Sequence, residues 1–469
     1  MNKFTKFIKV AITYFIGNVL SKLLAFLLIP LYTGHISTDT YGTYDLIVSL
    51  MSLIVPIIFF QIWDGLFRFI YDFEKEEDKY KILNNGLVVC CISIMVYEIL
   101  FFIINQFITI QNKWLVNIYG LSIAFQYVFG TAARTFQKNK LYMTTGVINT
   151  LINLFFNIIL IAGLNYNNAN ILYLSIIIGN IIQCAIISYK LNIFRNFRKT
   201  DINKKIIGDM IKFSMPIAVS TISYWLLSGY SKVIVSKKLG YEVNGIFAIA
   251  TKLASMIVVI VSVFQMSWHE TSFETANDKN KRDFYEKGIN LFYIVLMLAT
   301  IEIIPMVKII FPYFVRGEYI EAYNIIPIVL VYSAINSFAG FSSSQFLAEK
   351  NSKATLWTTL ASAILNVILG YILTIRFGLL GTTIALLISF TLNAVLRVVL
   401  LYILYSIKLN IKNVCVLIIL LIVSIVLYYT QTNIINLVYA FGLFILMCVL
   451  YRNQIKKICM NFIKSIKER

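Results

Sequence analysis

The sequence predicts an all-α polytopic membrane protein with about 14 transmembrane helices. Of its 469 residues, 59% are hydrophobic and only 13% are charged, and the mean hydropathy is +0.79. Soluble domains are about half apolar and about a quarter charged, so this composition indicates a chain that lies mostly in lipid. The basic residues stand mainly in short gaps between apolar runs. The net charge of +19 therefore reflects membrane topology and not a nucleic-acid partner.

Each predicted span is long enough to cross the bilayer, which takes roughly 20 mainly apolar residues. The first span follows a basic N-terminus as in a signal peptide, but no small-residue cleavage site follows it, so we expect it to be retained. The predicted spans are residues 11–33, 42–63, 83–108, 115–136, 142–164, 171–192, 211–235, 245–267, 288–311, 326–348, 354–374, 380–404, 413–431 and 437–451.

The basic residues also predict the orientation of the spans, because cytoplasmic segments are enriched in lysine and arginine. With a cytoplasmic N-terminus, 31 of the 41 basic residues lie in or beside inside segments, and five lie within spans. The five in outside loops are Lys113, Lys237, Lys238, Arg316 and Arg376. We therefore expect both chain termini on the cytoplasmic side.

The chain divides into two six-helix lobes at its longest inside connection. We expect an N-terminal lobe over residues 1–192, a basic cytoplasmic linker over 193–210 and a C-terminal lobe over 211–405. Residues 406–469 then hold the last two spans and a basic cytoplasmic tail. No connection is long enough to form a separate soluble domain.

The two lobes show an internal repeat. Gly42 and Gly245 lie 203 residues apart near the starts of spans two and eight. Glu98 and Glu302 lie 204 residues apart in spans three and nine. Since each lobe has six spans, corresponding segments cross the membrane in the same direction. This arrangement predicts a parallel repeat and pseudo-symmetric lobes.

Charged residues inside spans are the candidates for function, because a charge at the bilayer centre costs about 2.5–3.5 kcal/mol on insertion scales. Lys22 lies near the middle of the first span, too deep for its side chain to reach the interface comfortably. Asn18 and Ser21 share its helix face. We therefore expect this small and polar face to look at protein or water rather than lipid.

Lys252 and Lys232 are the candidates in spans eight and seven. Lys252 follows the predicted start of its span by seven residues, and it could bind an anion or belong to a buried ion pair. Lys232 lies toward the outer end of its span, where snorkelling to the interface is an equally good explanation. We expect Arg397 to snorkel to the inner face and Lys308 to reach the outer interface.

Glu98 and Glu302 are the only carboxylates that we place well inside spans. Each is a candidate site for a coupling proton or cation, because burial favours the protonated form of a carboxyl group. The alternative is an interfacial acid or a partner for a nearby cation. Asp64 and Arg68 stand four residues apart where span two ends, so we expect an ion pair that closes the cytoplasmic mouth.

The remaining polar residues show no catalytic or metal-binding pattern. His35 and His269 lie far apart with no ligand set around them, and none of the six cysteines forms a C-x-x-C motif. Asn149, Asn153 and Asn157 recur at four-residue spacing in span five, where they could bond helices together or form a polar wall. We expect no catalytic residue, no metal and no cofactor.

Five segments, taken in order along the chain, carry a family resemblance. They are GNVLSKLLAFLLIPLYTGHISTDTYGTYDL (17–46), DGLFRFIYD (64–72), FSMPIAVSTISYWLL (213–227), LGYEVNGIFAIATKLASM (239–256) and FGLLGTTIALLISF (377–390). Together they resemble bacterial polysaccharide repeat-unit flippases of the multidrug/oligosaccharidyl-lipid/polysaccharide exporter superfamily. The resemblance spans the whole chain, and the order of the segments is more specific than any one motif.

The resemblance implies two six-helix lobes around a central cavity lined mainly by spans one, two, seven and eight. It implies rocker-switch alternating access that flips an undecaprenyl-diphosphate-linked oligosaccharide across the bacterial cytoplasmic membrane for cell-surface polysaccharide biosynthesis. Lys22 and Lys252 match positions where such proteins carry cavity cations. Lys232 takes the basic place of a family Asp-Arg pair, although Ser231 stands here in place of the aspartate.

The partners implied by the resemblance are the lipid-linked oligosaccharide and a proton or sodium gradient. A polysaccharide polymerase and glycosyltransferases would act on the same glycan. These partners are expectations from the family and not from the pattern of residues.

Three other functions compete with this interpretation. A drug/cation antiporter of the same superfamily would favour an acidic cavity, whereas more lysines than acids lie inside these spans. A membrane polysaccharide polymerase would need a sizeable outer loop with catalytic acids or a metal pair, and the longest outer loop is only 312–325. A lipid II flippase is separated from a repeat-unit flippase only weakly by the sequence.

Overall fold

The computed structural model is helical throughout the ranges that it describes. These ranges are residues 22, 24, 26–70, 73, 75–107, 111–198, 201–258, 261, 268, 281–349 and 351–450. Every regular element within them is a helix, which confirms the predicted fold class. Eleven of these helices are long and apolar enough to cross a membrane.

The described helices fall into two sets along the chain. Those of the first half are α2 (Leu28–His35), α3 (Thr38–Ile58), α4 (Ile62–Ile70), α5 (Glu76–Phe107), α6 (Lys113–Thr135), α7 (Asn139–Asn157) with its π-helical continuation η1 (Ile158–Gly163), and α8 (Ala169–Lys190). Those of the second half are α9 (Lys204–Ser228), α10 (Tyr230–Lys238), α11 (Tyr241–Ala254), α13 (Lys281–Phe314), the 3-10 helix η3 (Gly317–Asn324), α14 (Ile326–Ala348), α15 (Ser352–Tyr405), α16 (Ile411–Thr430) and α17 (Asn433–Leu450).

Helix α15 contains two of the predicted spans. Its 54 residues would extend about 80 Å at 1.5 Å per residue, far beyond the roughly 30 Å hydrocarbon core. Gly378 interrupts it with φ 59° and ψ −141°, a conformation that glycine adopts without a steric penalty. α15 is therefore two helices joined by a kink, in agreement with the predicted spans 354–374 and 380–404. Most of the first predicted span lies outside the described residues.

Span two ends earlier than the sequence predicted. The expected end was residue 63, but α3 ends at Ile58 and α4 begins at Ile62. Pro56 has no N–H to donate to the preceding turn, and Phe60 and Gln61 have positive φ angles of 52° and 47°. Asp64 and Arg68 therefore lie on a separate short helix.

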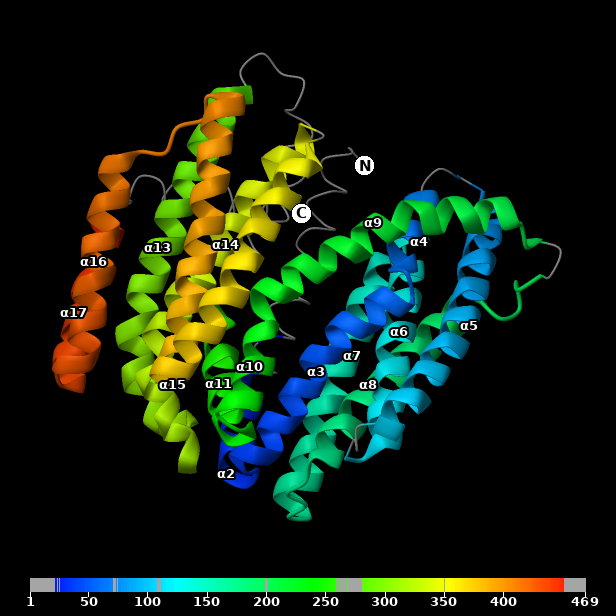
Figure 1. Cartoon of the computed structure of the whole chain (residues 1–469), viewed down its shortest axis with the longest axis horizontal. Coiled ribbons are helices and arrows are strands. Elements are labelled where there is room, and N and C mark those ends of the chain that lie inside the picture. The colour runs from blue at the N-terminus through cyan, green and yellow to red at the C-terminus, as the bar shows by residue number, and fades with distance from the viewer. Residues whose placement is uncertain are drawn as a thin grey trace, which may run out of the picture.

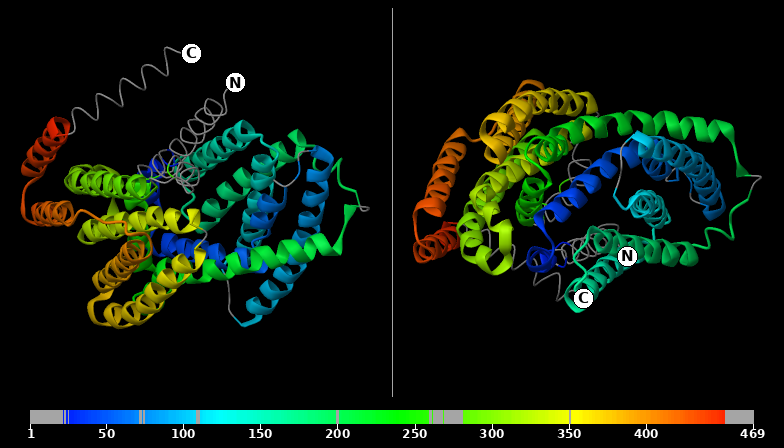
Figure 2. Two further views of the ribbon diagram at one scale, coloured as in Figure 1. Left: turned by 90° about the horizontal axis from the view of Figure 1, so that it is seen from above. Right: turned by 60° about the horizontal axis from the view of Figure 1, so that its bottom comes forward.

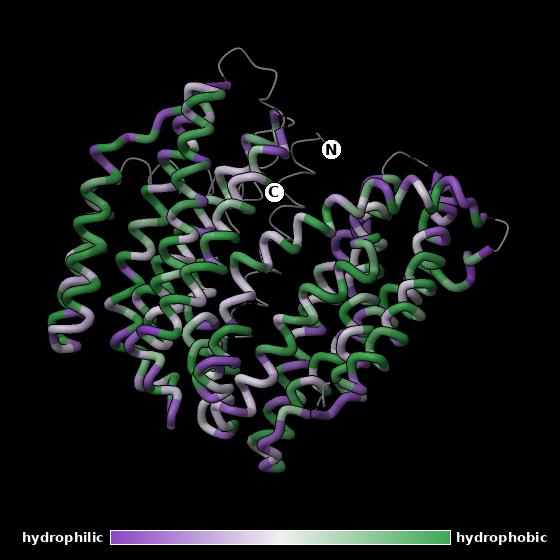
Figure 3. Tube along the Cα trace, viewed as in Figure 1, coloured by the Kyte–Doolittle hydropathy of each residue, from purple (hydrophilic) through white to green (hydrophobic). Residues whose placement is uncertain are grey.

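Apolar side chains cover the outer faces of the helices. In Figure 3 hydrophobic residues run along the helices and hydrophilic residues gather at their ends and turns. Phe102 and Phe441 are 67% and 65% exposed, and many leucines and isoleucines are similarly exposed. Soluble monomers rarely expose contiguous apolar surfaces of this extent. The exposed surface is therefore suited to lipid, and the chain is a multi-pass membrane protein.

The helices form two groups that meet at one end of the molecule. In Figure 1 helices α3 to α8 lie on one side and α10 to α17 on the other. The two groups come together around α2, α3 and α11 and spread apart toward the opposite end, and Figure 2 shows α9 running along one side of both (Figures 1 and 2). The buried apolar residues also form two clusters. One contains residues between Met51 and Met210, and the other contains residues of α2 together with residues mainly from α11 to α17.

The repeated glycines lie where α3 crosses α11. A methyl group on Gly42 would stand 1.8 Å from the Tyr241 carbonyl oxygen, and one on Gly245 would stand 2.1 Å from the Thr38 carbonyl oxygen. Only glycine permits two backbones to approach so closely. Asn244 also donates a 2.7 Å hydrogen bond to the Gly42 carbonyl oxygen. The repeat seen in the sequence thus marks a direct backbone contact between the two groups of helices.

Further hydrogen bonds hold the same end of the molecule together. Thr38 Oγ1 donates to Glu318 Oε2 at 2.7 Å, and the Tyr319 hydroxyl donates to the Ile36 and Ser37 carbonyl oxygens at 3.1 and 3.0 Å. These contacts join the α2–α3 connection to η3. We call this region, formed by residues 36–42, 241–245 and 318–319, the closed end.

Candidate functional site

Four neighbouring cavities lie among the helices, and each is named by one charged residue that lines it. The Asp64 cavity has a volume of about 380 Å³ and lies between α4, α6, α7 and α8. The Lys252 cavity, about 500 Å³, lies between α2, α3, α6, α7, α8 and α11. The Lys232 cavity, about 340 Å³, lies between α3, α9, α10, α11, α14 and α15. The Arg397 cavity, about 810 Å³, lies between α9, α14 and α15.

Adjacent cavities share lining residues. Gln126 and Tyr127 line both the Asp64 and the Lys252 cavities, and Val48 and Ser52 line both the Lys252 and the Lys232 cavities. Asn336 lines the Lys232 and the Arg397 cavities. The four cavities therefore lie side by side in a series that reaches from one group of helices to the other. We call this series the lumen.

Lys252 extends from α11 into the part of the lumen lined by the first half of the chain. Its Nζ atom lies 4.3 Å from the centre of the Tyr32 ring, a cation–π distance. The same atom donates a 3.4 Å hydrogen bond to the Tyr41 hydroxyl. In the described residues no carboxylate lies within ion-pair distance of this ammonium group. Lys252 therefore has no carboxylate within 4.0 Å in the described part of the chain, although the charge of Asp45 lies near enough to interact with it.

Lys22 lies beside the residues that follow α11. Its Nζ atom is 3.5 Å from the Val258 carbonyl oxygen, and Val258 lines the Arg397 cavity. Val258 and Lys252 line different cavities and Lys22 is not among the lining residues of either, so the expectation that Lys22 and Lys252 share one cavity stays a prediction. Asn18, the third residue on the predicted polar face, lies outside the described residues.

Lys232 has a partner that the sequence interpretation missed. Its Nζ atom lies 2.8 Å from Asp45 Oδ1, and the two side chains are only 21% and 15% exposed. Asp45 is the fourth residue of the predicted span 42–63, so it did not count among the carboxylates well inside spans. The expected snorkelling of Lys232 is replaced by an ion pair between α10 and α3.

The two predicted coupling acids lie between helices and away from the lumen. Glu98 Oε2 accepts a 2.8 Å hydrogen bond from Asn117 Nδ2, which joins α5 to α6. Glu302 on α13 lies near Tyr439 of α17, and its Oε2 atom is buried without a hydrogen-bond partner among the described residues. Neither residue lines any of the four cavities.

Asp64 has a different partner from the one that the sequence predicted. Gln61 Nε2 donates a 2.7 Å hydrogen bond to Asp64 Oδ2, and no ion pair within 4.0 Å joins Asp64 to Arg68 in the part of the chain that is described. Burial raises the pKa of Asp64, while the Gln61 bond and the charge of Arg134 partly offset this effect. The break between α3 and α4 places Gln61 beside Asp64. The four-residue spacing of Asp64 and Arg68 therefore did not decide which residue bonds to Asp64.

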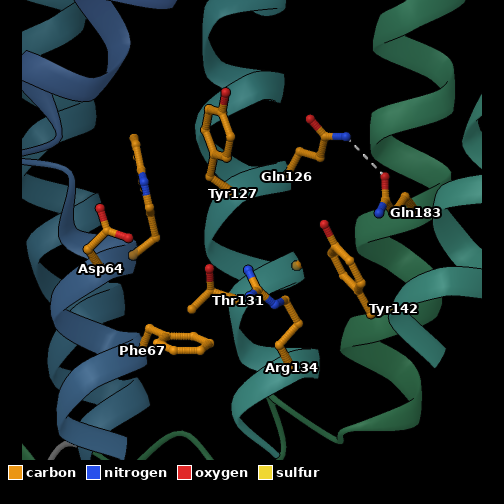
Figure 4. Close-up of a pocket in the computed structure, with 10 residues that line it drawn as sticks. Asp64, Phe67, Gln126, Tyr127, Thr131, Arg134, Tyr142 and Gln183 are labelled. Atoms are coloured by element: carbon orange, nitrogen blue, oxygen red, sulfur yellow. Dashed lines mark hydrogen bonds between the residues drawn. The ribbon is translucent and has the colours of Figure 1, made fainter. Parts of the chain in front are cut away.

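Arg134 is a lumen cation that the sequence interpretation did not identify. Figure 4 shows Asp64, Arg134 and Gln183 pointing into one cavity from α4, α6 and α8 (Figure 4). The Arg134 guanidinium stacks over Phe67 at 4.8 Å and Tyr142 at 5.7 Å from the ring centres. Arg134 lies at the end of the predicted span four, where basic residues usually reflect membrane topology. Its position in the sequence therefore could not distinguish a cavity residue from a residue that orients the chain.

The amide stripe of span five takes both of its expected roles. Asn149 Nδ2 donates to Asn180 Oδ1 at 2.9 Å and to Gln183 Oε1 at 2.7 Å, which bonds α7 to α8. Asn149 and Asn153 also line the Lys252 cavity. The lumen wall in this half is therefore rich in amides that can bond to hydroxyl groups.

Two basic residues expected at the membrane interfaces are buried instead. Lys308 is 8% exposed and donates to the Tyr428 and Gln431 carbonyl oxygens at the end of α16. Arg397 is 6% exposed and donates to Thr358, Thr359 and the Ala339 carbonyl oxygen. Partners on neighbouring helices replace the water that snorkelling would have supplied. In the ranges described, no group of three His, Cys, Asp or Glu side chains is placed to hold a metal ion.

The fold is similar to that of known membrane transporters. A lipid II flippase MurJ in an inward closed conformation matches with a TM-score of 0.69 at 16% identity, covering 96% of this chain and 100% of that chain. An inward-facing multidrug resistance MATE family transporter of the MOP superfamily matches with a TM-score of 0.67 at 15% identity, covering 85% and 95%. A MOP superfamily transporter from Pyrococcus furiosus matches with a TM-score of 0.59 at 13% identity, covering 88% and 96%.

At the level of sequence, no curated protein matches the chain significantly. A family model described as polysaccharide biosynthesis protein matches residues 7–268, which is more than half of the 469 residues. This match includes segments 36–42 and 241–245 of the closed end, the Lys252 cavity and the Asp45–Lys232 ion pair. The all-helical fold and this match agree, and the chain belongs to the polysaccharide biosynthesis protein family.

Proposed function

We propose that this protein is a flippase that moves lipid-linked oligosaccharides across the cytoplasmic membrane for cell-surface polysaccharide biosynthesis. The proposed substrate is an undecaprenyl-diphosphate-linked repeat unit, and the proposed mechanism is alternating access. The observation that carries the proposal is the position of the Lys252 ammonium group in the lumen. This group is a cation without a carboxylate partner among the described residues, and it extends into an amide-lined cavity of a polysaccharide-family membrane protein.

The charges of the lumen suit a diphosphate better than a cationic drug. Lys252, Arg134 and Arg397 line its cavities, whereas the lining carboxylate is Asp64. Lysine ammonium groups are compact charges that suit phosphate oxygens. In this proposal Lys252 and Lys22 face each other across the lumen and contact the diphosphate. Lys232 contributes less than the sequence implied, because Asp45 already compensates its charge.

The walls of the lumen suit a glycan. Trp63 stacks on Tyr127 with ring centres 4.6 Å apart beside Gln126 and Gln183. Aromatic faces and amides are the groups that hold sugar rings and hydroxyl groups through apolar contact and hydrogen bonds. The lipid tail would stay in the bilayer, since only the charged and hydroxylated parts of the substrate need a polar path.

The closed end fits an alternating-access cycle in which the protein opens to one side at a time. The proposed N-in and C-in orientation puts α3's first residues outside, so this conformation is shut toward the outside. Export then requires the Gly42–Gly245 crossing and the Thr38–Glu318 bond to separate. The proposed two-lobe division at residues 193–210 supplies the moving bodies.

A proton or sodium gradient is the proposed energy source, with Glu98 and Glu302 as the coupling residues. Both acids lie between helices, so each would act by changing the contact of α5 with α6 or of α13 with α17. Glu98→Gln and Glu302→Gln should therefore flatten the dependence of flipping on the imposed gradient in proteoliposomes. Wild-type gradient dependence in both variants would make the acids structural.

The experiment that tests the proposed function is flipping of a fluorescent undecaprenyl-diphosphate oligosaccharide by purified protein in proteoliposomes. Lys252→Gln should reduce the rate at least about tenfold, because one missing charge contact is worth more than the 1.4 kcal/mol that a tenfold change requires. Lys252→Arg should restore part of the rate, since it keeps the charge but changes the geometry.

Lys412→Gln is the matched control, because Lys412 is an exposed lysine at the start of α16 and away from the lumen. It should flip substrate at the wild-type rate. A Lys252→Gln variant that is folded and equally active would remove the diphosphate site from the proposal. A comparison of repeat units with lipid II in the same assay separates the repeat-unit flippase from the lipid II flippase, which is the second candidate.

A further inference from the structure

The Arg397 cavity holds a buried cation that no carboxylate neutralises. Arg397 is 6% exposed, and no carboxylate lies within 4.0 Å of it in the described ranges. Its Nε donates to Thr358 Oγ1 at 3.2 Å, its Nη2 donates to Thr359 Oγ1 at 2.9 Å, and its Nη1 donates to the Ala339 carbonyl oxygen. Neutral oxygens hold the guanidinium in place, but they leave its charge uncompensated.

The guanidinium also has unused donors. It carries five N–H groups, and the three hydrogen bonds to described residues use three of them. Because the group is fixed from three sides and lines a cavity of about 810 Å³, the remaining donors are positioned for a ligand. A buried charge without a counter-charge is costly, so a bound anion would stabilise the site.

Two neighbouring polar atoms point to the same conclusion independently. Asn393 is 3% exposed, and its Oδ1 atom is buried without a hydrogen-bond partner among the described residues. Thr355 Oγ1 is likewise buried and without a partner there. Both residues line the Arg397 cavity, and buried polar atoms normally have hydrogen-bond partners. One cation, one amide and one hydroxyl group thus line a space that no described residue fills.

We propose that the Arg397 cavity is a subsite for an anionic group on the glycan, so that the transported repeat unit carries an acidic sugar. This inference rests on the proposed function and names the class of its substrate. A carboxylate would accept the free N–H donors of Arg397, which suit planar two-oxygen groups. Asn393 and Thr355 would bond to neighbouring sugar hydroxyls. The diphosphate would remain at Lys252, in a different cavity.

The geometry favours the glycan over the carrier diphosphate as the source of the anion. Among the described residues that line the Arg397 cavity, Arg397 is the one cation and stands with amides, hydroxyl groups and the Tyr224 ring, which fits one negative charge on a polyhydroxyl molecule. It is larger than each of the three other cavities. The Lys232 cavity lies between it and the Lys252 cavity and shares lining residues with both, so the two proposed subsites belong to one series of neighbouring cavities.

The test is the thermal unfolding midpoint of the purified full-length protein, titrated at matched ionic strength with three probes. Sodium glucuronate represents an acidic sugar, glucose a neutral sugar and sodium pyrophosphate the carrier headgroup. A ligand that binds only the folded state raises the midpoint with its concentration. Glucuronate should raise the midpoint of the wild type and glucose should not.

Three variants distinguish a ligand subsite from a structural role. Asn393→Asp places a carboxylate four residues before Arg397 on the same helix, and it should reduce the apparent affinity for glucuronate at least about tenfold. Thr355→Val keeps the side-chain shape and should reduce it several-fold. Thr391→Val is the control, because Thr391 is exposed on the same helix outside the cavity, and it should leave the affinity unchanged.

Each alternative result overturns the inference. Absence of glucuronate binding to the wild type would remove the acidic-sugar subsite, and flipping in proteoliposomes would show whether the proposed function survives. If Asn393→Asp lost pyrophosphate binding while glucuronate never bound, Arg397 would belong to the carrier headgroup. Equal glucuronate affinity in all three variants would place the sugar elsewhere.

Discussion

At the scale of single residues, the ion pair between Lys232 and Asp45 shows how strongly a partner changes the role of a charge. The two residues lie 187 positions apart in the chain, yet Nζ and Oδ1 are 2.8 Å apart. Taken alone, Lys232 was a candidate for snorkelling or for substrate binding. Its partner makes it a contact between α10 and α3, whereas Lys252 has no carboxylate within 4.0 Å among the described residues.

Removing either partner of this pair should destabilise the protein. Asp45→Asn and Lys232→Gln should each cost about 3 kcal/mol, because each leaves one largely buried charge without its partner. The double variant Asp45→Asn/Lys232→Gln should recover part of this loss. Chemical or thermal unfolding of the purified variants measures these differences.

The pair between Lys281 and Glu349 offers the matched comparison. Its lysine side chain is 38% exposed, so Lys281→Gln should cost only about 0–1 kcal/mol. The loss of stability in the Asp45→Asn/Lys232→Gln double variant could instead equal the sum of the losses in the two single variants. That result would mean that the two charges do not interact appreciably in the folded protein.

At the scale of helices, the crossing of α3 and α11 decides how the two groups of helices meet. Gly42 and Gly245 allow backbone atoms to touch, and Asn244 bonds to the Gly42 carbonyl oxygen. The contact holds no large side chain, so it can be made and broken as a unit. This crossing is therefore the element on which the closed end depends.

Gly42→Ala should open the closed end. Its methyl group would stand 1.8 Å from the Tyr241 carbonyl oxygen, and overpacking of this kind costs about 1–3 kcal/mol. Ser52→Cys places a thiol in the lumen, where a membrane-impermeant reagent added outside should react faster in the Gly42→Ala background. The rate of labelling in cells or vesicles gives the measurement.

Gly208→Ala is the control for this substitution, because no atom lies within 4 Å of the added methyl group. It should leave labelling of the Ser52→Cys thiol unchanged. Equal labelling in the Gly42→Ala and Gly208→Ala backgrounds would show that the glycine crossing does not hold the outer side shut.

At the scale of the whole molecule, the helices form a lipid-exposed shell around a polar lumen. Exposed apolar side chains cover the outside, while amides, hydroxyl groups and basic residues line the neighbouring cavities. Basic residues thus occur in two places, in the connections between helices and in the lumen. Only their positions in three dimensions distinguish the two sets.

The proposed orientation predicts which loops are accessible from each side. In a cysteine-free background, single cysteines at 166–169 and 318–321 should react with impermeant reagents from outside, while those at 196–200 and 279–282 should not. The reason is the uneven distribution of lysine and arginine between the two sets of connections. Labelling of the 196–200 segment from outside intact cells would reverse the orientation.

The sequence by itself determined the all-helical membrane fold and the approximate spans. These features depend on local composition, because any stretch of about 20 apolar residues must form a helix to satisfy its backbone in lipid. Gly42 and Gly245 were recognisable from their spacing alone, and so was the amide stripe of span five. Lys252 was identified because a charge in a span is conspicuous whatever its surroundings.

Only the tertiary structure decided which charges are partnered and which are free. Asp45 binds Lys232, Gln61 binds Asp64, and Arg397 is fixed by neutral oxygens on other helices. These partners lie on different helices or across a break in the helix, where sequence spacing carries no information about distance. The energy of a buried charge depends on its nearest groups in space, so the composition of the lumen became evident only once the helices were packed together.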